Sequence, residues 1–135
     1  MKKVVMVIMI LSVLFLASCT YVDPAFLEDY NNQVAILETL SGEHENLVNE
    51  INENTNNPSY NREKMQEYLD WVDLNEDTIY NFKSFIELNY MKIERGGQNP
   101  DYVRDNLVQL LLVIQQNELD FRKIIAEQEA QNAIA

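Results

Sequence analysis

The strongest constraint on the fold is a local pattern that occurs three times: Asp or Asn, then Pro, then a small or acidic residue, then an aromatic residue. The three copies are the segments 23–26, 57–60 and 99–102. Asp and Asn side chains accept hydrogen bonds from the open amide groups of a first helical turn. Pro suits the first helical position because its missing N–H would be unpaired there. The pattern therefore predicts three helix N-termini.

Apolar residues at alternating spacings of three and four follow each of these starts, as they do in a helix with one buried face. From the starts and the breakers between them, we expect helices over about residues 24–53, 58–95 and 100–131, with the tail 132–135 frayed. Gly96 and Gly97 would end the second helix, because glycine readily adopts the left-handed conformation of a C-terminal cap. The chain has only 3 Gly and 3 Pro, too few for the turns of an all-β fold.

Short connections make neighbouring helices antiparallel. The sequence therefore predicts an all-α domain over residues 23–131, built as an up-down-up antiparallel bundle of three long, coiled-coil-like helices. Polar residues interrupt the apolar positions at Ser41, His44, Asn75, Asn89 and Asn117. Because a buried Asn can set the register and partner number of a coiled coil, the alternative is a longer coiled coil that completes its core as a homo-oligomer.

A separate pattern occupies the N-terminus. Residues 1–3 are positively charged, residues 4–16 are apolar apart from one Ser, and small residues follow. An apolar run this short is typical of a signal peptide and not of a membrane-spanning helix. The run ends on Leu16, Ala17, Ser18 and Cys19.

These four residues resemble the lipobox of bacterial lipoproteins, whose pattern is Leu, a small residue, Ser, Gly or Ala, and then Cys. The resemblance implies that residues 1–18 are a signal peptide, that signal peptidase II recognises Leu16, Ala17 and Ser18, and that Cys19 carries diacylglycerol on its sulfur. Residues 19–22 would then be the acylated Cys and a short tether. Two or three acyl chains hold a protein stably on a membrane. The resemblance thus implies an extracytoplasmic protein on the cell membrane or outer membrane, and the alternative is an uncleaved anchor.

The charge of the chain is strongly acidic, with 22 Asp and Glu against 10 Lys and Arg and a formal net charge of −12. Loss of Lys2 and Lys3 with the signal peptide would make it −14. We expect no binding to nucleic acid, because neutralising the phosphates needs clustered Lys and Arg. Residues 20–58 hold eight acids and no Lys or Arg. We expect anionic headgroups to repel this segment, and we interpret it as a solvated face or a docking face for a basic partner.

Catalytic and metal-binding patterns are incomplete. His44 is the single His, and Val48 stands where the zinc pattern His-Glu-x-x-His needs its second ligand. We therefore interpret His44 as a histidine of the apolar seam that is either bonded to a neighbour or partly exposed to water. Residues 73–77 resemble the opening of a calcium loop, but Thr78 and Ser84 replace the Gly and Glu that such a loop needs. We expect no enzyme activity, no metal and no cofactor apart from the covalent lipid on Cys19.

Aromatic residues outside the apolar seams are the candidate partner contacts. Trp71 and Tyr80 fall there, and exposed aromatics on a rigid helix are typical anchors for a protein partner. We expect Tyr60 and Tyr102 to pack against each other. The function favoured is a non-enzymatic interaction or scaffold module that binds an envelope protein. The alternatives are an inhibitor or immunity-type lipoprotein, which binds a basic enzyme or toxin through the acidic first helix, and a small-ligand carrier.

Overall fold

The computed structural model describes residues 22–134, so the predicted signal peptide and Cys19 lie outside the described residues. Residues 22–134 form helices and contain no strand, which confirms the predicted all-α class. In chain order the helices are α2 (Pro24–Glu53), α3 (Pro58–Leu88), α4 (Tyr90–Arg95) and α5 (Pro100–Ile134).

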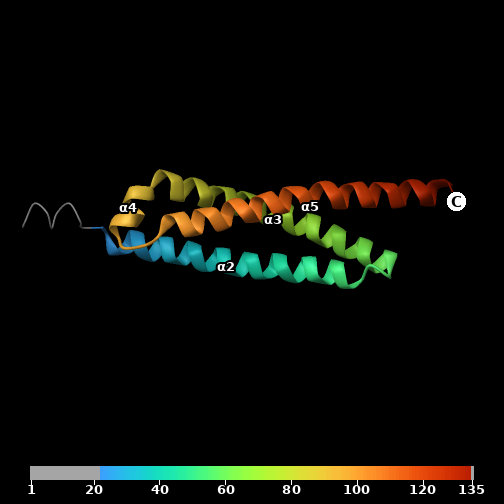
Figure 1. Ribbon diagram of the computed structural model, residues 1–135, viewed down its shortest axis with the longest axis horizontal. Helices are drawn as coiled ribbons and strands as arrows, with labels where there is room; N and C mark the ends of the chain where they lie inside the picture. Colours follow the sequence, from blue (N-terminus) through green and yellow to red (C-terminus); the bar gives the residue numbers. More distant parts are fainter. Residues whose placement is uncertain (1–21, 135) are drawn as a thin grey trace, which may run out of the picture.

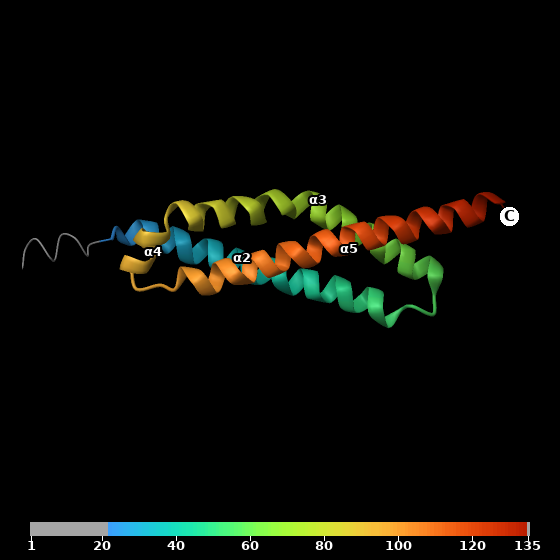
Figure 2. The same cartoon turned by 45° about the horizontal axis from the view of Figure 1, so that its top comes forward.

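The long helices lie lengthwise beside one another and alternate in direction (Figure 1). α2 leads away from the N-terminal end, α3 returns, and α5 leads away again, with the short α4 at the end where α2 begins. α3 is the central element, because it packs against both α2 and α5. Figure 2 shows that α5 diverges from α2 along its length and that its C-terminal end projects past the connection between α2 and α3.

Each long helix begins at one of the three predicted N-termini. Asp23 accepts a hydrogen bond from the backbone N–H of Ala25 at 3.0 Å. Asn57 and Asn99 each accept one from the N–H three residues later, at 3.3 and 3.4 Å. The first residue of each helix is Pro. The repeated pattern therefore acts as a set of helix caps, as predicted.

The segment expected as one helix over 58–95 is divided at Asn89, where φ is −113° and ψ is 16°. The Nδ2 atom of Asn89 donates to the backbone carbonyl of Phe85 at 2.9 Å, and the backbone N–H of Asn89 donates to the same oxygen. Asn side chains compete with the backbone for such bonds and so disfavour helix interiors. α3 and α4 meet at Asn89 in a bend.

The connection from α4 to α5 is a glycine cap. Gly97 has a φ of +81°, and its N–H donates to the carbonyl of Glu94 at 3.0 Å. The N–H of Gln98 donates to the carbonyl of Ile93 at 3.2 Å, which completes the Schellman pattern. Gly96 lies against the side chain of Leu27, which occupies the space that a Cβ atom would need. Residues 132–134, which were expected to fray, continue α5.

The core lies along both faces that α3 presents to its neighbours. All four helices contribute to it, so residues 22–134 constitute a folded unit with a core of their own. No helix within this part of the chain is apolar over a length that would cross a bilayer. The most deeply buried side chains are Tyr30, Tyr68, Val72, Ile79, Ile86, Ile93, Leu107 and Ile114.

Candidate functional site

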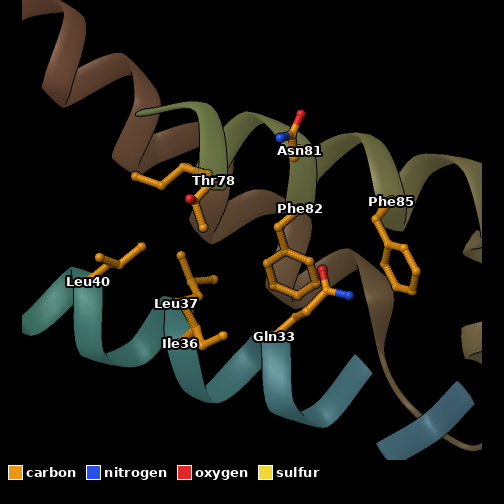
Figure 3. A pocket seen from close by; sticks show the side chains of 9 residues that line it. Gln33, Ile36, Leu37, Leu40, Thr78, Asn81, Phe82 and Phe85 are labelled. Carbon is orange, nitrogen blue, oxygen red and sulfur yellow. The ribbon is translucent and has the colours of Figure 1, made fainter. Parts of the chain in front are cut away.

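The candidate site is an apolar groove between α2 and α3, shown in Figure 3. One hollow in it has a volume of about 370 Å³. Its polar lining residues, Gln33, Thr78 and Asn81, are uncharged, although the chain as a whole is strongly acidic. Aliphatic residues from α2 face aromatic residues from α3 across it. The apolar lining consists of Ile36, Leu37, Leu40, Ile79, Phe82 and Phe85.

The groove continues along the same two helices, further from the N-terminal end. Leu40 lines both parts, and Leu47, Trp71 and Leu74 line the second part. Three carboxylates also border this second part, Glu43, Glu50 and Glu67. We call the whole surface the α2–α3 groove. It therefore has an uncharged half near the start of α2 and an acidic half further along.

Two large apolar side chains at the groove are exposed to solvent. Ile36 on α2 is 51% exposed and Leu74 on α3 is 80% exposed. Contiguous apolar surface of this kind marks binding sites more often than isolated exposed residues do. An apolar segment that bound in this groove would therefore bury its own apolar surface, and that of the groove, away from water.

Trp71 forms part of the wall of the acidic half. Its Nε1–H donates to Oε2 of Glu43 at 2.9 Å, and its ring lies 5.6 Å from that of His44 and 6.2 Å from that of Tyr68. The side chain is half-buried. Trp71 is consequently held in one position, with one side on the core and the other toward the groove.

A buried polar cluster lies directly behind Trp71. The hydroxyl of Tyr68 is 2.8 Å from Nε2 of His44, and Nδ2 of Asn117 donates to the same hydroxyl at 3.3 Å. The Tyr68 hydroxyl thus accepts from Asn117 and shares a second hydrogen bond with Nε2 of His44, in which the tautomer of the imidazole decides which group donates. Phe121 covers the Tyr68 ring edge-on, with 5.0 Å between centroids.

Burial sets the charge of this cluster. It lowers the pKa of His44 and raises the pKa of Tyr68 to about 12, an increase that the hydrogen bond from Asn117 opposes. Both groups are therefore neutral at pH 7. Every described side-chain polar atom that is buried has a hydrogen-bond partner. Of the two alternatives for His44, the structure shows a buried histidine bonded to a neighbour. The cluster joins α2, α3 and α5.

Tyr80 lies on a different face of α3 from Trp71. Its hydroxyl accepts a hydrogen bond from Nε2 of Gln115 on α5 at 2.8 Å, and the residue is 37% exposed. Nine residues separate the two aromatics, and at 3.6 residues per turn this rotates the second to about 180° from the first. The structure therefore places Trp71 at the α2–α3 groove and Tyr80 beside α5.

Tyr60 and Tyr102 do not form the expected pair. Tyr60 is in the first turn of α3 and Tyr102 is in the first turn of α5. Because these two helices run in opposite directions, their first turns lie at opposite ends of the molecule (Figure 1). Tyr102 instead stands at a hollow between α2 and α5 that Val34 and Glu38 also line.

Ile36 and Leu74, two exposed residues of the groove, were not predicted as contacts from the sequence, because only aromatic residues outside the seams were candidates. Both are large apolar residues at such positions. The stretch 73–77, which resembles the opening of a calcium loop, is a helical part of α3. Within residues 22–134 no group of three or more His, Cys, Asp or Glu side chains is placed to hold a metal ion.

Comparisons with protein families, with curated protein sequences and with solved structures found no match to this chain.

Proposed function

We propose that this protein is a lipid-anchored, non-enzymatic interaction module of the bacterial cell envelope. In this proposal Cys19 carries the lipid, and the long helices act as an up-down-up bundle in which α4 forms part of the second turn. The α2–α3 groove binds an amphipathic helix of an envelope protein. The lipobox resemblance of residues 16–19 supports the anchor, and the groove supports the partner.

One observation carries the choice of partner. The groove exposes Ile36 and Leu74 between two helices that lie side by side, and its half near the start of α2 lacks charged residues. The α2 residues that line it run from 33 to 50, a length of about 25 Å at 1.5 Å per residue. This shape suits the apolar face of a helix, which a groove binds through side chains at positions i, i+3, i+4 and i+7.

The acidic half of the groove defines the charge of the partner. Lys64 pairs with Glu50 at 2.9 Å and with Glu67 at 2.8 Å, and Glu43 is bonded to Trp71. Three carboxylates against one ammonium group leave this half negative. We therefore expect a Lys or Arg near one end of the partner helix and an apolar face along the rest.

Site-specific photo-crosslinking in cells tests the groove. A crosslinking residue is placed at position 74 in the groove and, as a matched control, at position 119 on α5, where Leu119 is also an exposed leucine. The proposal expects one identified envelope protein to be captured from position 74 and not from position 119. Equal capture from both positions, or capture only of the chain itself, would contradict it.

A binding measurement follows with the identified protein. Ile36→Asp places a charge in the uncharged half and should weaken binding at least tenfold, which corresponds to about 1.4 kcal/mol. Leu119→Asp is the matched control and should leave the affinity unchanged. Unchanged helicity of both variants by circular dichroism shows that the fold is retained.

The lipid anchor is tested by itself. Cells that express the full chain should incorporate labelled palmitate into it, and Cys19→Ser should abolish the label. Cys19 is the single cysteine in the chain, so a residual label in the variant would contradict thioether lipidation.

An inhibitor or immunity-type lipoprotein is the second candidate, and the run of eight acids without Lys or Arg over residues 20–58 favours it. It differs in its salt dependence. Screening shortens the reach of charge interactions from about 30 Å at 0.01 M salt to about 3 Å at 1 M. A basic enzyme or toxin held by the acids of α2 would therefore dissociate as salt is added, whereas a helix held by apolar contacts in the groove would remain bound.

A further inference from the structure

A second exposed apolar surface lies at the end of the molecule where the described chain begins. Leu88, the last residue of α3, is 85% exposed, and Met91 on α4 is 58% exposed. Lys92 and Arg95 lie on the same short helix. We call these four residues the α4 patch. They line one surface hollow together with Val22, the first described residue.

The charge of the α4 patch differs from that of the rest of the chain. Neither Lys92 nor Arg95 forms an ion pair with a carboxylate of residues 22–134. Lys92 instead places Nζ 4.1 Å from the centre of the Phe26 ring, at the first turn of α2. Glu87 lines the same hollow, but it is paired with Lys83 at 2.7 Å. Lys92 and Arg95 therefore give the hollow a positive charge beside two exposed apolar side chains, which is the combination that favours binding at a membrane interface.

The position of the α4 patch relative to the proposed anchor identifies its occupant. Val22 borders the patch and follows Cys19 by three residues. Three residues span at most about 11 Å when fully extended. A lipid on Cys19 would therefore keep Val22, and with it the α4 patch that Val22 borders, close to the polar and interfacial region of the bilayer.

We propose that the α4 patch docks onto the phospholipid surface, with Leu88 and Met91 at the boundary of headgroups and acyl chains and Lys92 and Arg95 against lipid phosphates. The proposal rests on the lipid anchor under Proposed function. It fixes the orientation of the domain: α2, α3 and α5 stand away from the bilayer, and the α2–α3 groove faces the surrounding space.

This orientation differs from the expectation that headgroups repel the segment nearest the anchor. That expectation followed the order of residues along the chain. In the structure, the five acids from Glu38 onward lie further along α2, and three others stand at its beginning. The return of the chain along α3 brings α4, with Lys92 and Arg95, to that same end (Figure 1). The residues closest to the bilayer are then those of α4 as well as those that begin α2.

The test imposes the anchor chemically, so that it does not depend on lipidation in cells. The chain from Cys19 onward is coupled through its single thiol to a maleimide lipid in vesicles of phosphatidylcholine and phosphatidylglycerol in equal amounts. Leu88→Trp introduces an indole into the patch, and Leu74→Trp is the matched control on α3. Fluorescence is compared in vesicles with and without bromine on the acyl chains, and the parental chain supplies the baseline of its single Trp71.

Docking predicts that the indole at position 88 loses on the order of half its emission to brominated lipid, because interfacial residues reach about 5–10 Å into the headgroup and acyl boundary. The indole at position 74 should not be quenched. Met91→Glu added to Leu88→Trp should reduce the quenching several-fold, and circular dichroism should show that helicity is kept. Equal quenching at positions 88 and 74, or none at 88, would overturn docking.

Failure of docking and failure of the anchor give different results. Absence of palmitate from Cys19 in cells, with quenching at position 88 in the coupled vesicles, would contradict the lipoprotein assignment and leave the surface affinity of α4 established. Palmitate on Cys19 without quenching at position 88 would retain the anchor and overturn the docking.

Discussion

Tyr68 is the residue on which the middle of the core depends, because its hydroxyl is bonded both to His44 and to Asn117. Tyr68→Phe would leave the buried His44 and the half-buried Asn117 without this partner. Loss of the partner of a buried group costs about 1–3 kcal/mol, and Asn117 can bond to water instead, so we expect the free energy of unfolding to fall by about 1–3 kcal/mol. Tyr80→Phe, which removes an exposed hydroxyl, should change it by less than about 0.5 kcal/mol. Urea unfolding of both variants measures the difference, and equal effects would contradict the role of the cluster.

His44 makes the stability depend on pH. Burial lowers the pKa of His44 in the folded protein, so the unfolded chain binds a proton that the folded chain does not. Stability is therefore full above about pH 6.5, the unfolded value, and falls as the pH drops below it, by at most about 1.4 kcal/mol per pH unit. His44→Gln removes the single His and should flatten this slope between pH 7.5 and 5.5. Parallel stability curves for the two proteins would contradict the prediction.

For a single residue, the sequence predicts whether the side chain faces the core more reliably than it predicts which side chain will be its hydrogen-bond partner. The position of His44 in an apolar seam predicts a histidine that is bonded to a neighbour or partly exposed to water. Its partner, Tyr68, is on another helix, and the pairing depends on how far α2 and α3 slide past each other, which the local pattern does not contain. The opposite faces of Trp71 and Tyr80, by contrast, follow from their separation of nine residues alone.

At the scale of elements, two glycines should respond to the same substitution in opposite directions. Gly42 lies within α2, and an added Cβ atom there would have no neighbouring atom within 4 Å, so Gly42→Ala should stabilise the protein by about 0.5–1 kcal/mol. Gly97 has a φ of +81°, so Gly97→Ala should destabilise it by about 1–2 kcal/mol. Thermal unfolding of the two variants checks both signs. Destabilisation by Gly42→Ala would show that the helix is not regular at that position.

The helix starts were predictable because capping is local, whereas the bend at Asn89 was not. Ile86, Asn89 and Ile93 keep the spacing of the apolar seam, so the periodicity continues unchanged through the bend. The Asn89 side chain makes a second hydrogen bond to the Phe85 carbonyl. Asn75 makes the same bond to Trp71 inside α3 without a break, so neither the residue type nor this bond alone determines where the helix divides.

At the scale of the whole molecule, the alternating directions of the long helices follow from the short connections, but the α2–α3 groove does not. Side chains of two packed helices leave a groove along the side that no third helix covers. α2 and α3 pack against each other, and no residue of α5 lines the groove beside them. Neither the spacing nor the composition of the chain indicates which side of this pair α5 leaves uncovered.

The net charge of the whole molecule leads to the last prediction. With 22 acids against 10 bases in the full chain, repulsion between carboxylates opposes folding, and added salt should raise the melting temperature by screening it. Exposed ion pairs act in the opposite direction, but each contributes about 1 kcal/mol or less.

The double variant Glu38→Gln, Glu45→Gln removes two exposed α2 acids that form no ion pair within residues 22–134. Its melting temperature should be higher than that of the parent at low salt and should rise less as salt is added. A melting temperature that falls with salt would show instead that ion pairs outweigh the repulsion.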